Sequence, residues 1–378
     1  MLELIITTLF GMEATVSHEV KKLGYEVIEV SDGRVILKGN LSAIVRCNLW
    51  IRTGERILIK IGEATVTTFD EMFDFVKSLP WSEWIGKEDA FPVKGYSLKS
   101  GLSSVPSCQS VIKKAIVRSL EANYHQSWFP ESGTLYQIEF SLIKDKLTLM
   151  IDTSGQPLHK RGYRKNSNQA PLKETIAAAM VILSRFRYDG IFADPFCGSG
   201  TIPIEAGMIA KNIAPGLTRE FTAMKFRQIP KKFWDKGKDE AKSAIRHDTK
   251  LKILASDIDP HAVALTAHNA KLSDTLDLME ISQKAMADFS PPCTEGTLVC
   301  NPPYGTRLLD EKECRRLYQE IGCLFHSRLS GWSLFILTPE ENFEEYFGKN
   351  CNKKRKLYNG MIKCNLFQYF SQQTKKDV

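Results

Sequence analysis

The chain has 378 residues, of which 43% are hydrophobic and 25% are charged. These values exclude an intrinsically disordered chain and are ordinary for a globular protein of two to three domains. The formal net charge of +7 permits a polyanionic partner but does not demand one, because a basic balance often serves only solubility.

The cysteine pattern and the apolar runs indicate the compartment in which the protein is found. Nine cysteines are spaced singly, without a C-x-x-C pair or a zinc-like spacing, so we expect no metal requirement. No apolar run approaches the length of a membrane span, and residues 1–6 resemble a strand without the basic region of a signal peptide. We expect a reduced, cytoplasmic protein without a membrane partner.

The first 153 residues alternate between strand and helix patterns. The predicted strands of a first unit are 4–8, 25–30, 34–38 and 56–61, and its helices are 13–23 and 41–49. A second unit has predicted helices 68–79 and 107–124 and predicted strands 91–97, 136–143 and 146–152. The pattern therefore predicts two α+β domains, over residues 1–60 and 61–153.

A basic linker at residues 154–169, rich in Gly, Pro, Ser and Asn, precedes a different pattern over residues 170–378. The predicted helices there are 172–187, 201–211, 260–272 and 311–329, and the predicted strands are 191–194, 251–256, 297–300 and 332–337. Strands alternating with helices predict an α/β domain with a doubly wound, mostly parallel, Rossmann-like sheet. Such a sheet binds its ligand at the carboxyl ends of its strands.

The turn D-P-F-C-G-S-G-T, residues 194–201, joins a predicted strand to a predicted helix. Glycines in such a turn let the backbone approach a ligand without a Cβ in the way. The dinucleotide fingerprint would need a glycine at Pro203, and no phosphate-binding G-K-[ST] is present. An acidic strand end would instead suit a ligand with a cationic amino-acid part. The candidate ligand residues of this turn are Asp194, Pro195, Phe196, Gly198, Ser199, Gly200 and Thr201.

Two further acidic motifs follow predicted strands. In S-D-I-D-P, residues 256–260, Asp257 can accept hydrogen bonds from ribose hydroxyls, with Ile258 beside it. Either aspartate of this motif can instead cap the next helix, and we assign that role to Asp259. Asp288, in A-D-F, can accept a hydrogen bond from an adenine amino group, although a lone Asp-Phe pair is more often a surface feature.

The motif N-P-P-Y, residues 301–304, comes directly after a predicted strand. An exocyclic amino group of a nucleobase is a poor nucleophile because its lone pair is delocalised into the ring. The side-chain oxygen of Asn301 and a backbone carbonyl held by the rigid Pro302 and Pro303 can accept its two hydrogens and orient it. Tyr304 can stack on a base turned out of its helix. The alternative is an ordinary stiff turn.

The four motifs, in this order, resemble the class I S-adenosylmethionine-dependent methyltransferases that modify amino groups of bases. This resemblance covers about residues 170–378. The segments S-G-Q-P-L-H-K-R-G-Y-R, residues 154–164, and A-P-L-K-E-T, residues 170–175, resemble the THUMP-bearing RNA methyltransferases. The bacterial 23S rRNA guanine-N2 methyltransferases are the most similar group. The resemblance implies a ferredoxin-like domain over 1–60, a THUMP RNA-binding domain over 61–153, and S-adenosylmethionine as cofactor.

The resemblance also implies a role for each motif. Asp194, Gly198 and Gly200 would shape the methionine end of the cofactor pocket. Asp257 would hold the ribose, and Asp288 the adenine. The target amino group would lie in line with the methyl group, held by Asn301, Pro302 and Tyr304.

Two basic segments leave alternatives open. The run His159–Lys165 can be a solvated face, or it can bind RNA if Tyr163 stacks on a base while Lys160, Arg161 and Arg164 contact phosphates. The insertion at residues 212–250, with Phe226, Trp234 and several lysines, can contact RNA or form only a basic helical cover.

The leading hypothesis is methyl transfer from S-adenosylmethionine to an exocyclic base nitrogen, guanine N2 of 23S rRNA. Guanine N2 of tRNA, or adenine N6 of a nucleic acid, is a rival, because the same Asn-Pro-Pro-Tyr chemistry serves both amino groups. A non-catalytic RNA-binding adaptor is the alternative from another class. The intact acidic and glycine positions argue against that alternative.

Overall fold

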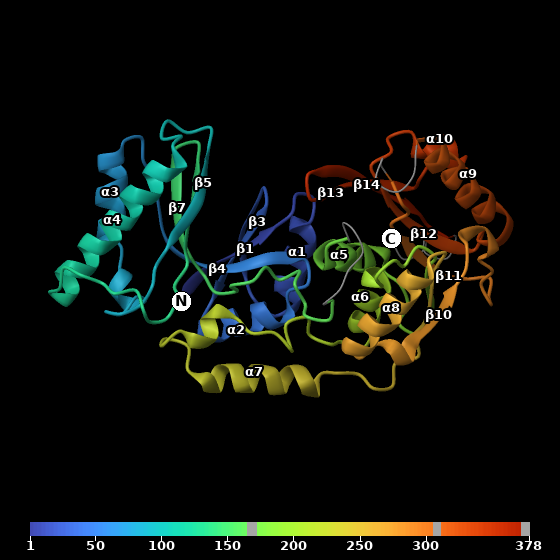
Figure 1. The fold of residues 1–378 in the computed structure, drawn as a ribbon, viewed down its shortest axis with the longest axis horizontal. Coiled ribbons are helices and arrows are strands. Elements are labelled where there is room, and N and C mark those ends of the chain that lie inside the picture. The colour runs from blue at the N-terminus through green and yellow to red at the C-terminus, as the bar shows by residue number, and fades with distance from the viewer. Residues whose placement is uncertain (165–171, 305–310, 372–378) are drawn as a thin grey trace. The chain divides into compact units, whose positions relative to one another are not determined.

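The computed structural model describes residues 1–164, 172–304 and 311–371 (Figure 1). These residues form two compact units. Unit 1 comprises residues 1–8, 17–158 and 219–239, and unit 2 comprises residues 9–16 and the rest of the described chain. The segment 219–239 lies within the predicted domain 170–378 but belongs to unit 1. Residues 165–171 of the linker region and Gly305 of N-P-P-Y-G lie outside the described residues.

Unit 1 is built on a seven-stranded sheet in the order β2-β3-β1-β4-β7-β6-β5. Its strands are β1 (Leu2–Thr8), β2 (Val27–Ser31), β3 (Arg34–Gly39), β4 (Gly54–Thr65), β5 (Val93–Leu98), β6 (Ile138–Ile143) and β7 (Lys146–Asp152). Neighbouring strands are antiparallel except β5 and β6. Because β4 pairs with both β1 and β7, the two predicted N-terminal domains share one sheet, and the predicted boundary at residue 60 falls inside β4.

Three of the four helices at the N-terminal end of the chain begin at a residue whose side chain caps the helix. The four helices are α1 (Glu13–Lys22), α2 (Leu41–Trp50), α3 (Phe69–Ser78) and α4 (Val105–Tyr124). The Asn40 side chain accepts from the amide of Ala43 at the start of α2, and Thr68 forms a capping box with Glu71 at the start of α3. Helices α3 and α4 pack together beside β5 (Figure 1).

The insertion predicted at residues 212–250 contributes part of unit 1, including most of α7 (Lys231–Ser243). The ring of Phe226 stacks on Tyr136 with centroids 4.2 Å apart, and the Tyr136 hydroxyl donates to Gln228 Oε1 at 3.1 Å. Phe226 and Trp234 are both buried. The aromatic residues of the insertion are therefore packing anchors, which favours the helical cover over direct RNA contact for these two side chains.

Unit 2 contains a second seven-stranded sheet, in the order β10-β9-β8-β11-β12-β14-β13. Its strands are β8 (Ile191–Asp194), β9 (Lys252–Asp257), β10 (Met279–Gln283), β11 (Gly296–Cys300), β12 (Trp332–Thr338), β13 (Lys353–Asn359) and β14 (Ile362–Tyr369). Strands β8 to β12 are parallel, and β14 is antiparallel to both of its neighbours. The β13–β14 hairpin was not predicted, because four consecutive cations at the start of β13 hide the strand alternation.

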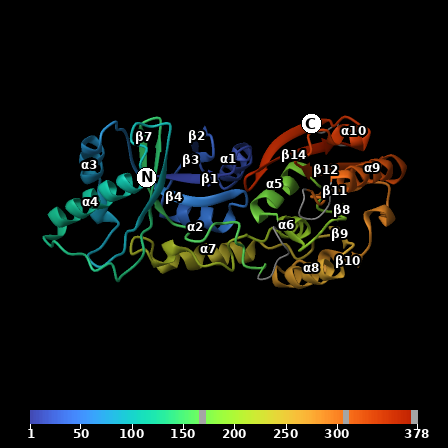
Figure 2. The same ribbon diagram turned by 45° about the horizontal axis from the view of Figure 1, so that its top comes forward.

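Helices cover both faces of this sheet (Figure 2). Helices α5 (Glu174–Ser184) and α6 (Thr201–Ala210) contribute to one hydrophobic cluster, and α9 (Glu311–Arg328) and α10 (Phe343–Phe347) to another. Helix α8 (Pro260–Leu272) follows β9. The doubly wound, mostly parallel architecture predicted for the C-terminal part is therefore confirmed. In the described segments, no helix combines the length and apolar character that a membrane span needs.

Candidate active site

The order of the unit 2 sheet reverses between β8 and β11, which lie side by side. Ligands of open α/β sheets bind at such a switch point, outside the carboxyl ends of the strands. Strand β8 ends at Asp194, the adjacent β9 ends at Asp257, and β11 ends immediately before Asn301. The fold thus brings three predicted site residues from distant segments to one sheet edge. We call Asp194, Asp257 and Asn301 the carboxyl-edge residues.

The turn after β8 is held in place by β9 and α8. The amide of Gly198 donates to Asp257 Oδ2 at 2.9 Å. From α8, Thr266 Oγ1 donates to the Gly198 carbonyl at 3.0 Å and Asn269 Nδ2 to the Ser199 carbonyl at 2.9 Å. Sequence reasoning missed Thr266 and Asn269, whose only signal was their polarity on the buried face of a helix.

The two glycines of the turn serve different purposes. Gly198 has φ +56°, and a Cβ added there would meet no atom within 4 Å, so open space lies beside its backbone. Gly200 has φ +83°, and an added Cβ would lie 3.0 Å from Thr266 Cγ2. Gly198 therefore offers a ligand close approach to the backbone, whereas Gly200 is required by its φ and by close packing against α8.

Asp194 is buried at the base of the turn and accepts a hydrogen bond from the amide of Phe196 at 3.1 Å. Burial raises the pKa of its carboxyl well above the usual range, and the neighbouring Asp257 raises it further. No cation of the described chain forms an ion pair with it. A ligand ammonium group at this position would supply the missing positive charge.

The other predicted residues of the turn lie between β8 and the start of α6. Pro195 and Phe196 follow β8 directly, and Ser199 and Thr201 are buried, with hydroxyl oxygens 3.4 Å apart. Helix α6 begins at Thr201.

Asp257 and Ile258 lie together at the end of β9. Asp257 uses one carboxylate oxygen for the Gly198 amide and the other for the amide of Asp259, at 3.0 Å, which fixes its side chain at the edge. Ile258 is 70% exposed, although it is a large apolar side chain. Asp259 caps α8 by accepting from the amide of His261 at 2.9 Å, in agreement with the capping role predicted for it.

Asp288 lies at the end of a short 3₁₀ turn, Met286–Asp288, rather than directly after β10. Its side chain is exposed. The structure therefore leaves it available at the surface of unit 2 but does not bring it into hydrogen-bond contact with the carboxyl-edge residues.

Asn301 carries the most informative polar atom of this edge. Its side-chain Oδ1 is buried from solvent and accepts no hydrogen bond from any described residue. A buried acceptor without a donor costs free energy of about 1–3 kcal/mol. Pro302 is buried and Pro303 is half-buried. Because each proline ring fixes the φ angle of its residue, the segment that follows β11 is stiff. The arrangement holds a carbonyl oxygen ready for an external N–H group.

Tyr304 has partners that the sequence did not reveal. Its hydroxyl accepts from Asn359 Nδ2 at 2.9 Å and lies 3.9 Å from Cys364 Sγ, both in the β13–β14 hairpin. Burial raises the pKa of this hydroxyl. Its ring is half-buried against the core beneath the sheet. The hairpin therefore fixes the last described residue of the Asn-Pro-Pro-Tyr motif.

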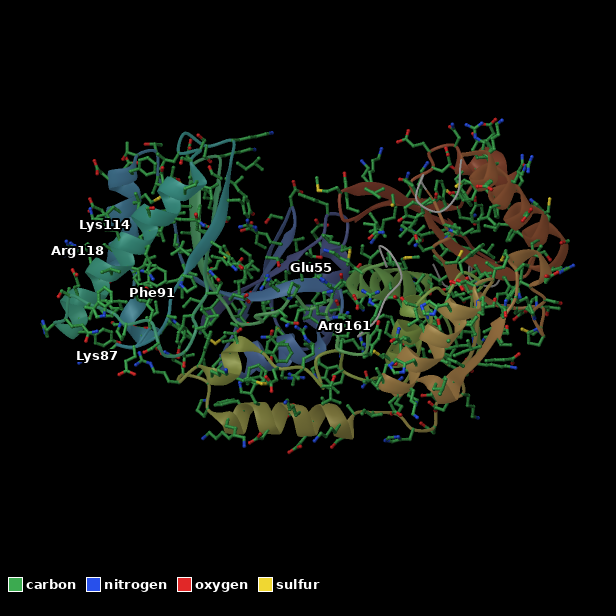
Figure 3. All side chains as sticks on the ribbon, in the orientation of Figure 1. Glu55, Lys87, Phe91, Lys114, Arg118 and Arg161 are labelled. Carbon is green, nitrogen blue, oxygen red and sulfur yellow. The ribbon has the colours of Figure 1, made fainter. Side chains whose placement is uncertain are left out.

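Arg161 and Tyr163, two of the residues predicted to bind RNA, lie inside the fold. Both side chains are buried: Arg161 Nε and the Tyr163 hydroxyl donate to Glu205 Oε1, at 3.2 and 3.3 Å. Burial opposes the charge of Arg161, but Glu205 outweighs it and raises the guanidinium pKa. Burial, with Glu205 and Glu174, raises the pKa of Tyr163. Local composition could not reveal these acidic partners, because they lie on α5 and α6. Arg161 is labelled in Figure 3.

Arg164 is also engaged within unit 2. Its guanidinium pairs with Glu174 at 2.9 Å and donates to the Leu172 carbonyl at 2.9 Å and to Thr201 Oγ1 at 3.0 Å. These contacts within the fold oppose the phosphate contact predicted for Arg164. Of the four predicted RNA-binding residues, Lys160 is exposed. We call Arg161, Tyr163, Arg164, Glu174 and Glu205 the linker cluster.

The carboxyl edge fits S-adenosylmethionine. The open space beside Gly198 leaves room for a ligand. The buried carboxyl of Asp194 suits the ammonium group of that molecule, and the exposed Ile258 next to Asp257 suits its adenine ring. Among the residues that the structure describes, no group of three or more His, Cys, Asp or Glu side chains could hold a metal ion.

Comparison with known proteins identifies the domains. Residues 161–368 match a family described as an RMKL-like methyltransferase domain. Residues 3–58 match the RlmL ferredoxin-like domain, and residues 66–152 match the THUMP domain. These matches confirm the ferredoxin-like, THUMP and class I methyltransferase domains expected from the sequence.

Two relatives that match almost the whole of this chain are also named as methyltransferases. A Bacillus subtilis protein named "Putative RNA methyltransferase YpsC" is 44% identical over 97% of this chain and 96% of its own length. The "Ribosomal RNA large subunit methyltransferase K/L" of Shewanella frigidimarina is 30% identical over 97% of this chain but only 53% of its own. The chain thus spans about half the length of that relative.

A solved structure described as SMU.472, "a putative methyltransferase complexed with SAH", superposes with a TM-score of 0.93 at 41% identity, over 98% of both chains. SAH is the product left when S-adenosylmethionine gives up its methyl group. The expectation of S-adenosylmethionine as cofactor is therefore confirmed, and the chain belongs to the family of RMKL-like methyltransferases.

Proposed function

We propose that the protein transfers a methyl group from S-adenosylmethionine to an exocyclic amino group of RNA, and specifically to N2 of a guanine in 23S rRNA. The observation that carries this proposal is the buried Oδ1 of Asn301, which lacks a donor in the described chain. An amino group bound there would satisfy an acceptor that the protein leaves unpaired. An exocyclic amino group can donate two hydrogen bonds, whereas a hydroxyl target can donate only one and a carbon target none.

RNA as the substrate class is supported by unit 1 and by the relatives. The THUMP domain carries the exposed cations Lys87, Lys114 and Arg118, labelled in Figure 3. Cations on such a surface can contact phosphates without selecting a sequence. The relatives named above are designated RNA and ribosomal RNA methyltransferases. Ribosomal RNA of the large subunit is therefore the first substrate to test, with tRNA as the second.

The proposed roles follow from what each side chain can bind. Bound S-adenosylmethionine supplies a methyl group made reactive by its sulfonium centre. Asp194 would neutralise the ammonium of its methionine part, Asp257 would accept from the ribose hydroxyls, and Ile258 would cover the adenine face. Asp288 would accept from the adenine amino group.

Asn301 would orient the target amino group with its Oδ1, and the stiffness of Pro302 and Pro303 would hold a backbone carbonyl for the second N–H. The base would lie beside Tyr304. Because the attacking amine loses its proton after the bond forms, positioning rather than a strong base would drive the reaction.

Nucleoside mass spectrometry tests the proposal. RNA from cells lacking the protein is incubated with the purified protein and S-adenosylmethionine that carries a deuterated methyl group, and the nucleosides of 23S rRNA and tRNA are analysed separately. We expect label in N2-methylguanosine from 23S rRNA. Label in N6-methyladenosine would overturn the assignment of the base, and label only in tRNA would overturn the assignment of the RNA.

Adenine N6 is the second candidate, and Asn301 favours it as much as guanine N2. Both amino groups carry two hydrogens and a delocalised lone pair, so the same acceptors serve both. The non-catalytic adaptor would be supported if the protein bound RNA but transferred no label to any nucleoside.

A further inference from the structure

The β13–β14 hairpin extends past the carboxyl edge of the unit 2 sheet. The last residue of β12, Thr338, pairs with Asn365, whereas the hairpin continues to the pair Asn359 and Ile362. Three more residues of β14 therefore reach beyond the end of β12, about 10 Å at 3.3–3.4 Å per residue. This is the edge at which β11 delivers Asn301, because β11 and β12 run parallel. The hairpin thus rises beside the candidate active site.

The tip of the hairpin is apolar and exposed. Met361 is 97% exposed and Ile362 is 47% exposed. Phe10, 55% exposed, makes an edge-to-face contact with Tyr358 of the same hairpin, with ring centroids 6.2 Å apart. Single exposed apolar residues are common, but three such side chains, Phe10, Met361 and Ile362, near one protruding hairpin are unusual for a free surface. The group suits a partner with flat apolar faces.

The same hairpin is strongly basic. Residues 353–356 read Lys-Lys-Arg-Lys, and Lys363 lies on the opposite strand. Lysines on an edge strand such as β13 can simply prevent unwanted strand pairing. That explanation does not account for the exposed Met361, which would promote association instead. Cations beside an aromatic ring, here Tyr358, are a combination that single-stranded nucleic acid binds.

A direct contact joins this hairpin to the Asn-Pro-Pro-Tyr motif. Asn359, adjacent to the turn, donates to the Tyr304 hydroxyl at 2.9 Å. Tyr304 in turn is three residues from Asn301. A strand of RNA seated on the hairpin tip would therefore lie next to the nucleotide whose amino group Asn301 holds.

We propose that the tip of the β13–β14 hairpin, Met361 and Ile362, packs against a base next to the target nucleotide, while Lys356, the cation of residues 353–356 nearest to the tip, contacts an adjoining phosphate. The occupant is the RNA strand that carries the target, so this inference rests on the proposed function. An apolar side chain placed against the neighbouring base stabilises the RNA with its target turned out of the stack. The hairpin would therefore determine how tightly substrate RNA binds, without taking part in methyl transfer.

The test compares Met361→Asp with Met361→Leu, using an unmethylated 23S rRNA transcript as substrate. Leu272→Asp, at a 44% exposed position of α8, is the matched control for a new surface charge. We expect Met361→Asp to raise the KM for RNA about tenfold, the size expected when the apolar burial of one methionine side chain is lost. Met361→Leu and Leu272→Asp should stay within about twofold of the wild type. S-adenosylmethionine affinity and the thermal midpoint should be unchanged in all three.

The possible failures are distinguishable. If the wild type methylates the transcript and Met361→Asp has an unchanged KM, the hairpin inference is overturned while the proposed function stands. If the wild type transfers no methyl group to any RNA, both are overturned. An equal rise in KM for Leu272→Asp would also overturn the inference, because charge alone would then explain the effect.

Discussion

The carboxyl-edge residues and the linker cluster are both sets of polar side chains within unit 2, but they differ in whether the protein itself supplies their partners. In the linker cluster, Arg161, Tyr163 and Arg164 are all bonded to acidic partners of unit 2. At the carboxyl edge, Asn301 Oδ1 has no donor and Asp194 has no cation among the described residues. The cations and the hydroxyl of the linker cluster are thus paired within the fold, whereas a ligand can supply the donor and the positive charge that the carboxyl edge lacks.

Substitutions in the linker cluster should lower the stability of the fold, and this is the largest effect that we expect. Glu205→Ala removes the carboxylate that pairs with the buried Arg161. The loss should lower the free energy of unfolding by about 3–5 kcal/mol. Glu205→Gln, which keeps an acceptor oxygen, is the control and should cost less. Thermal and urea unfolding measure both. If Glu205→Ala kept the wild-type unfolding midpoint and bound RNA more tightly, Arg161 would bind RNA rather than stabilise the fold. That result would contradict the structural role assigned to the linker cluster.

Substitutions at the carboxyl edge should weaken the binding of S-adenosylmethionine. Asp194→Asn keeps the acceptor for the Phe196 amide but removes the charge that would pair with the cofactor. We expect S-adenosylmethionine affinity to fall by about 2–5 kcal/mol, as for other buried charge pairs. Calorimetric titration measures this loss, and unchanged affinity would remove Asp194 from the site.

The same variant has a pH signature in the protein without cofactor. Because the pKa of Asp194 is raised, its neutral form stabilises the fold most below the unfolded-state pKa of about 3.9. That contribution is lost as the pH rises through the folded-state pKa. Asp194→Asn should therefore have the higher melting temperature at pH 8, with the difference shrinking toward pH 4. A difference independent of pH would contradict the buried, ionisable carboxyl.

Substitutions of Gly198 and Gly200 should have smaller effects, on ligand binding at Gly198 and on stability at Gly200. Gly200→Ala forces a Cβ against Thr266 at positive φ and should cost about 1–3 kcal/mol of stability. Gly198→Ala meets open space, so it should cost less stability but weaken S-adenosylmethionine binding. Unfolding and calorimetry on both variants check this. Equal effects on binding would mean that Gly198 has no ligand-facing role.

Lys160 should show the smallest effect. It is the exposed member of the four residues predicted to bind RNA. If it contacts one phosphate, Lys160→Ala should reduce the slope of log affinity against log salt by about 0.7, without changing stability. Filter-binding measurements over a range of salt concentrations are sufficient. An unchanged slope would leave the whole run His159–Arg164 without a role in RNA binding.

The motif residues at strand ends could be predicted because each motif carries its own local signal. Strand, turn and helix follow one another around Asp194, Asp257 and Asn301, so their meeting at one edge follows from a parallel sheet. The capping role of Asp259 was also visible, since a short acidic residue before Pro260 is a common helix start.

What the sequence could not supply were partners distant along the chain. Arg161 and Tyr163 look like a charged surface run until Glu205, on α6, is placed beside them. The shared N-terminal sheet depends on the length of β4, which continues through the predicted boundary. The hairpin that fixes Tyr304 was hidden by a run of cations where alternation was expected.

Single-turnover methyl transfer by Asn301→Ala tests the central claim most directly. Labelled S-adenosylmethionine bound to the protein is mixed with 23S rRNA, and Asn342→Ala, at an exposed position before α10, serves as the control. We predict a rate about a hundred- to a thousandfold lower for Asn301→Ala, with cofactor affinity unchanged. A wild-type rate from Asn301→Ala would contradict the claim that its buried oxygen orients the target amino group.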